Sequence, residues 1–85
     1  MTAEETRLRG RYATKRDGGL TYEYEGTYFK TDDLIVWRAR VFREGIPRGT
    51  TYGRLSVDRA LKGAAVQRDA VRAEITSAIE QLRED

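Results

Sequence analysis

The sequence predicts an α+β domain: a three- to four-stranded antiparallel β-meander with one long C-terminal α-helix packed on one of its faces. Residues 6–55 alternate apolar and polar side chains with a period of two, which is typical of strands with one buried face. Residues 56–84 instead place apolar side chains at helical spacing. Because 85 residues are enough for one domain, we expect both segments to form a single unit over residues 1–85.

The first hairpin is expected to join strands near residues 6–14 and 20–30 through a turn at residues 15–19, where two glycines can adopt positive φ. Apolar side chains alternate with charged or threonine side chains along both strands. One register puts the apolar side chains of both strands on the same face. Its pairs are Tyr12 with Tyr22, Arg11 with Glu23 and Arg9 with Glu25.

A third strand is expected over residues 33–43, after a tight turn at Thr31-Asp32. This turn puts Trp37 opposite Gly26, where the indole ring can lie over the bare backbone. It also places the acidic positions of the second strand beside arginines on both neighbouring strands. The remaining predicted pairs are Glu25 with Arg38, Glu23 with Arg40 and Tyr24 with Ala39.

Residues 44–49 are expected to form a loop, because Pro47 has a fixed φ and no amide hydrogen. The arginines and glycines of residues 45–54 could bind an anion. An ordinary connection is the favoured interpretation, because the segment lacks the Gly-Lys-Ser/Thr ending of a phosphate-binding loop. The sequence leaves open whether residues 50–55 form a short fourth strand or an irregular edge segment.

Ser56 is a good N-cap candidate for the helix, and Asp58 would lie in its first turn. A helix of about 27 residues spans roughly 40 Å, whereas a strand of eight residues spans roughly 27 Å. The helix is therefore expected either to break or to pack its C-terminal end on a partner. Gly63 weakens its first third, and the sequence leaves open whether the helix continues through this residue.

The composition argues against most enzyme chemistry. The chain has no histidine and no cysteine, which removes disulfides, thiolate sites, the commonest zinc ligand and any Ser-His or Cys-His catalytic set. A carboxylate pair such as Asp32 with Asp33 lies in an expected turn, without an apolar pocket that would shift a pKa. We therefore expect no catalytic, cofactor-binding or metal-binding residues. No long apolar run and no signal-peptide core are visible, so we expect a cytoplasmic protein without membrane contact.

The charge pattern allows two classes of partner. The 16 basic and 14 acidic residues give a net charge of +2, which is weaker than a usual nucleic-acid footprint. Most of the basic residues are arginine, which pairs with both carboxylates and phosphates. On the polar face of the sheet, arginines flank Glu23 and Glu25, which favours a cross-strand ladder of opposite charges over an open phosphate platform. The aromatic residues fall on the other face, where core packing explains them.

Two resemblances rest on the strand Trp37-Arg38-Ala39-Arg40-Val41-Phe42 and on Tyr52-Gly53-Arg54-Leu55-Ser56, which leads into an Ala-rich helix. Over residues 20–80 the order of elements resembles small bacterial domains of unknown function, with a β-meander and a C-terminal helix. This resemblance implies an architecture and no activity.

The same strings also look like the plant-type AP2 DNA-binding domain, in which outward Arg and Trp residues of a three-stranded sheet enter the major groove. That resemblance implies that Arg38 and Arg40 are the matching DNA contacts. The chain departs from the family pattern because Glu23 and Glu25 interrupt the basic face, Leu55 replaces an aromatic residue and the helix is longer.

We expect a non-enzymatic binding module whose partner is a protein, including a homodimer in which the overhanging helix end meets a second copy. The interface residues would be Ile75, Ile79 and Leu82, together with residues 48–54. The alternative is a nucleic-acid-binding domain that uses the arginine-rich outer face of the sheet. Together these hypotheses give the candidate binding residues Arg9, Arg11, Arg38, Arg40, Arg48, Tyr52 and Arg54.

Overall fold

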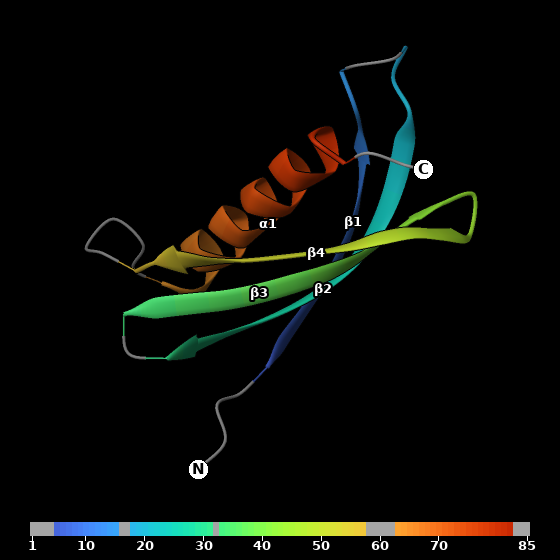
Figure 1. The fold of residues 1–85 in the computed structure, drawn as a ribbon. Helices are drawn as coiled ribbons and strands as arrows, with labels where there is room; N and C mark the ends of the chain where they lie inside the picture. Colours follow the sequence, from blue (N-terminus) through green and yellow to red (C-terminus); the bar gives the residue numbers. More distant parts are fainter. Residues whose placement is uncertain (1–4, 16–17, 32, 58–62, 83–85) are drawn as a thin grey trace.

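The computed structural model describes residues 5–15, 18–31, 33–57 and 63–82 as one antiparallel sheet with a helix packed across it (Figure 1). The elements are β1 (Thr6–Ala13), β2 (Thr21–Thr31), β3 (Leu34–Arg43), β4 (Ile46–Ser56) and α1 (Ala64–Glu80). The strands follow one another across the sheet in chain order, β1-β2-β3-β4. The predicted α+β meander with a C-terminal helix is therefore confirmed, and it has four strands.

The core lies between α1 and one face of the sheet. Alternate residues of β1, β2 and β3 point towards the helix, as the period-two pattern predicts, and α1 contributes a stripe of apolar side chains. Burying each large side chain of this kind stabilises the fold by about 1.5–3 kcal/mol. The buried apolar residues are Leu8, Tyr22, Tyr24, Tyr28, Ile35, Trp37, Ala39, Val41, Val71, Ile75 and Ile79.

Polar contacts attach α1 to the β1 side of the sheet. In the middle of the helix, Arg72 Nη1 donates to the backbone oxygen of Arg9 at 3.1 Å and to the Tyr24 hydroxyl at 2.9 Å. At its C-terminal end, Glu80 Oε1 accepts hydrogen bonds of 2.8 Å from the Tyr12 hydroxyl and from the backbone N–H of Lys15. The hydrogen bond to Glu80, followed by burial and by the charge of Glu80, raises the pKa of Tyr12 above 10.0. These bonds hold α1 against the part of the sheet formed by β1 and β2.

The predicted β1–β2 register is confirmed, with Arg9 opposite Glu25 and Arg11 opposite Glu23. The predicted β2–β3 register is wrong by two residues. Thr31 pairs with Leu34, so the turn lies one residue later than expected. Asp32 itself lies outside the described residues. An even shift leaves every side chain on its predicted face but changes its partner. The observed pairs are Glu25 with Arg40, Gly26 with Ala39, Tyr28 with Trp37 and Thr27 with Arg38.

The loop expected at residues 44–49 is wrong, because β4 begins at Ile46. Only Glu44 and Gly45 connect β3 to β4, with φ of 55° and 77°. Positive φ at both central residues belongs to the two-residue turn that matches the twist of a hairpin. The register shifts between Val41 and Phe42, where Phe42 pairs with Pro47. A proline is tolerated there because β4 is an edge strand and the ladder is interrupted by the irregularity.

The expected helix start at Ser56 is also wrong, because Ser56 is the last residue of β4 and pairs with Leu34. Asp58 lies outside the described residues. The helix begins after Gly63, whose φ of 94° suits glycine at the helix boundary. The 17 residues of α1 rise about 26 Å, which matches the length of a strand. Within the described residues, the overhang that suggested a helix-end partner is therefore absent.

Candidate functional site

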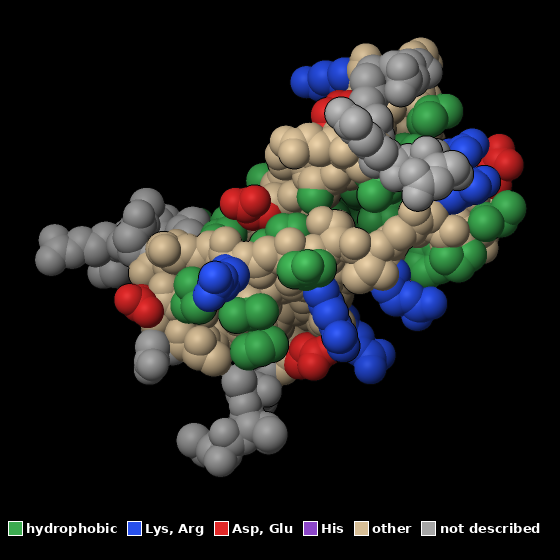
Figure 2. Space-filling view, in the orientation of Figure 1, with side chains coloured by type: hydrophobic (Ala, Val, Ile, Leu, Met, Phe, Trp, Pro, Cys, Tyr) green, Lys and Arg blue, Asp and Glu red, His purple; other side chains and the backbone are tan. Residues whose placement is uncertain are grey.

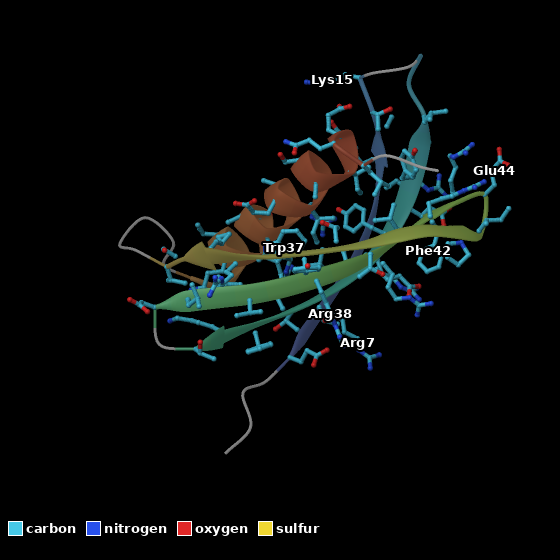
Figure 3. All side chains as sticks on the ribbon, in the orientation of Figure 1. Arg7, Lys15, Trp37, Arg38, Phe42 and Glu44 are labelled. Carbon is cyan, nitrogen blue, oxygen red and sulfur yellow. The ribbon has the colours of Figure 1, made fainter. Side chains whose placement is uncertain are left out.

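The face of the sheet opposite α1, here called the open face, carries most of the charged side chains of the four strands. Figure 3 shows Arg7 and Arg38 projecting from this face, whereas Trp37 lies between the sheet and the helix. Figure 2 shows basic side chains, coloured blue, projecting from the lower side of the sheet next to an acidic one, coloured red. Strand alternation and register place fourteen central positions there. They are Arg7, Arg9, Arg11, Glu23, Glu25, Thr27, Phe29, Val36, Arg38, Arg40, Phe42, Thr50, Tyr52 and Arg54.

Two ion pairs link β1 to β2 on the open face. Arg9 Nη2 lies 3.3 Å from Glu25 Oε1, and Arg11 Nη2 lies 3.7 Å from Glu23 Oε1. The side chains of Arg9 and Glu25 are 81% and 50% exposed. Exposed pairs of this kind contribute about 0–1 kcal/mol. These carboxylates therefore neutralise part of the face without holding its arginines rigidly.

One row across the sheet carries arginines without a carboxylate. Arg7 faces Thr27 on β2, Thr27 faces Arg38 on β3, and Arg38 faces Tyr52 on β4. Among the residues that the structure describes, neither Arg7 nor Arg38 forms a salt bridge. The predicted register would have paired Arg38 with Glu25. The observed register moves that carboxylate next to Arg40 and leaves Arg38 beside a threonine.

Two of the hollows on the open face adjoin each other. The first, of about 480 Å³, is polar at its rim and includes Arg7, Arg9, Arg38 and Arg40 together with Glu5 and Glu25. The second, of about 370 Å³, is lined mainly by apolar side chains. Its residues are Glu5, Thr27, Phe29, Val36, Trp37, Arg38 and Tyr52. Glu5, Thr27 and Arg38 border both hollows, so an arginine-lined space passes directly into an aromatic one.

Aromatic rings on the open face are accessible. Tyr52 is 80% exposed on the edge strand β4, and Phe29 is half-buried on β2. The guanidinium carbon of Arg40 lies 5.4 Å from the centre of the Phe42 ring, which is cation–π distance. The face therefore combines cations with aromatic surfaces, a pairing that suits ligands with both negative charge and flat rings.

The structure brings six of the seven predicted binding residues together on the open face. They are Arg9, Arg11, Arg38, Arg40, Tyr52 and Arg54. Arg48, the seventh, lies half-buried at the irregular part of β4 and outside both hollows. The list of predicted binding residues omits Arg7, although the alternation of β1 places it on the charged face, and it omits Phe29. Their alternation with Leu8 and Tyr28, which are buried, is the sequence signal that places both on this face.

Two of the three residues of the predicted helix-end interface are not accessible. Ile75 and Ile79 are fully buried against the sheet. Leu82 is half-buried, and its Cδ1 lies 3.3 Å from the position that a Cβ would occupy at Gly49. A partner cannot contact the two isoleucines without opening the domain. Their helical spacing is explained by packing within the chain.

The described parts of the chain contain no group of three or more Asp and Glu side chains placed to hold a metal ion. No helix among them is both long and apolar enough to cross a membrane. Comparisons with protein-family models, with curated proteins and with solved structures found no match to this chain.

Proposed function

We propose that this chain is a non-enzymatic nucleic-acid-binding module whose open face holds the phosphate backbone. The observation that carries the proposal is the row of Arg7, Thr27 and Arg38, in which two arginines border a hollow without a carboxylate between them. Planar guanidinium groups pair bidentately with phosphate oxygens. A polyanion is the ligand that such a row favours.

The charge on the open face supports the same ligand. The open face has more positive than negative side chains. Its arginines are Arg7, Arg9, Arg11, Arg38, Arg40 and Arg54, and its carboxylates are Glu23, Glu25 and the neighbouring Glu5. The exposed pairs Arg9–Glu25 and Arg11–Glu23 are weak enough for their arginines to turn towards a phosphate. Because backbone contacts supply most non-specific affinity, the face needs no base-specific contact to bind.

A protein partner has less support from the geometry. The hypothesis rested on a helix that extends past the sheet and on the apolar residues Ile75 and Ile79 at its end. The described helix is no longer than the strands, and both isoleucines belong to the core.

The test is a fluorescence-anisotropy titration with short labelled oligonucleotides at several salt concentrations. In the variant Arg38→Ala/Arg40→Ala, the plot of the logarithm of the binding constant against the logarithm of salt concentration should become less steep. For a single strand the magnitude of its slope should decrease by about 1.4, because two phosphate contacts are lost. The matched control is Lys30→Ala/Arg68→Ala, which removes the same charge from exposed residues on β2 and α1. Lys30 shares the helix side of the sheet with Tyr28.

The control should keep the slope of the wild-type protein. Equal loss of affinity in both double variants would mean that net charge, and not the open face, attracts the nucleic acid. No binding by the wild-type protein at low salt would overturn the proposal entirely.

A further inference from the structure

We infer that the nucleic acid is a single strand whose bases stack on Tyr52 and Phe29 while its phosphates lie along the arginine-lined hollow. This inference rests on the proposed function and adds that the bound nucleic acid is single-stranded. Its basis is the direct junction of two hollows with different chemistry, one bordered by Arg7 and Arg40 and the other by aromatic rings.

The aromatic hollow matches the chemistry of an unpaired base. Tyr52 presents a ring that is 80% exposed, an unusual exposure for a large aromatic side chain. Phe29 and Val36 provide an apolar floor next to it, and Arg38 stands at the border with the polar hollow. Every base has a π-face, so rings of this kind bind single strands with little sequence preference. The backbone phosphates that flank a nucleotide with a stacked base would then lie within reach of the cations.

Duplex DNA fits this surface less well. Three inter-strand spacings set the outer strands about 14 Å apart, whereas the major groove is about 12 Å wide. A sheet with four strands, as observed here, is too wide to enter the groove with its whole face. In a duplex the base faces are also covered by stacking, which leaves Tyr52 and Phe29 only edges and backbone to contact.

The experiment compares three labelled ligands of equal length in anisotropy titrations at fixed salt. They are an oligothymidylate, the same strand annealed to its complement, and an abasic phosphodiester strand. The variants are Tyr52→Ala, which removes the ring, and Tyr52→Phe, which keeps it. Val66→Ala is the matched control, because Val66 is an exposed apolar residue on α1. Tyr52 is exposed, so its loss leaves the core intact, and the buried Trp37 reports folding by its fluorescence.

The wild-type protein should bind the oligothymidylate about tenfold more tightly than the abasic strand. Tyr52→Ala should lose at least about fivefold in affinity for the oligothymidylate and nothing for the abasic strand. Tyr52→Phe and Val66→Ala should behave like the wild-type protein.

Equal binding of all three ligands, unchanged by Tyr52→Ala, would overturn the inference and leave the proposed phosphate-binding function standing. Preference for the duplex would do the same. Absence of binding to any of the three at low salt would overturn both.

Discussion

The indole ring of Trp37 lies against the backbone of Gly53. A Cβ at residue 53 would stand 2.8 Å from Trp37 Cζ2 and 3.1 Å from Trp37 Nε1. The two residues face each other across β3 and β4 on the helix side of the sheet. Their chain neighbours Arg38 and Tyr52 therefore face each other on the open face. This contact in the core aligns the strands that carry both parts of the proposed ligand site.

Gly53→Ala should destabilise the domain by about 1–3 kcal/mol, because the added methyl group overpacks the contact with the indole ring. Urea unfolding gives the free energy directly. In the background Trp37→Leu the same substitution should cost much less, since the smaller side chain leaves room for a methyl group. An equal cost in both backgrounds would mean that the ring is not what restricts residue 53.

The faces of the sheet could be predicted from the sequence, but the β2–β3 partners could not. Alternation assigns Trp37 to the core and Arg38 to the surface in either register, since a shift by two residues preserves the faces. What separates the two registers is whether the turn begins at Thr31 or one residue later. The apolar pattern contains no information on this point. The shift changes the partner of Arg38 from Glu25 to Thr27, so the uncompensated row emerged only in the structure.

The ends of β4 and α1 were missed for a different reason. Glycines, threonines and Pro47 make β4 look like a loop, yet an edge strand tolerates a proline and the tight turn at Glu44-Gly45 returns the chain at once. Ser56 has the side chain of an N-cap, but its pairing with Leu34 keeps it in the sheet. Tertiary pairing overrode local preference at both places, and the assignment of Arg54 and Tyr52 to the open face depended on it.

Glu44→Asn should stabilise the domain by about 0.5–1 kcal/mol. Glu44 has φ of 55°, a left-handed conformation that costs a glutamate more than an asparagine. A gain of this size raises Tm by a few degrees for a domain of this length. Glu44→Ala is the control, because the Cβ of alanine has the same steric cost as that of glutamate in the left-handed conformation. Equal Tm values for the two variants would contradict the expected role of the turn conformation.

Tyr12→Phe should lower stability at neutral pH and lose its effect at high pH. The hydrogen bond to Glu80 raises the pKa of Tyr12 above 10.0, so the unfolded chain releases the phenolic proton first. The stabilisation is therefore complete below pH 10 and is lost as the pH rises through the pKa of the folded state. Urea unfolding of both proteins from pH 7 to about pH 11 measures the difference.

A second substitution tests whether Glu80 causes the pH dependence of the Tyr12→Phe effect. In the background Glu80→Gln, the pH dependence of the Tyr12→Phe effect should shrink, because the hydrogen bond to the carboxylate, which raises the pKa of Tyr12 most, is weakened and the charge of Glu80 is lost. A pH dependence that persists in full in this background would show that another group causes it.

Glu25→Gln should strengthen the binding of single-stranded nucleic acid two- to fivefold, or about 0.5–1 kcal/mol. Glu25 stands between Arg9, with which it forms an ion pair of 3.3 Å, and Arg40. Removing its charge leaves both arginines available to phosphate, and the exposed pair contributes too little to threaten the fold. The gain should shrink as salt rises.

Glu74→Gln is the matched control, because it makes the same charge change at an exposed position of α1. If net charge alone attracted the ligand, both variants would gain equally. A gain confined to Glu25→Gln places the phosphates beside Arg9 and Arg40. A loss of affinity would instead mean that the carboxylate of Glu25 itself contacts the ligand. In that case the open face does not act as a phosphate platform.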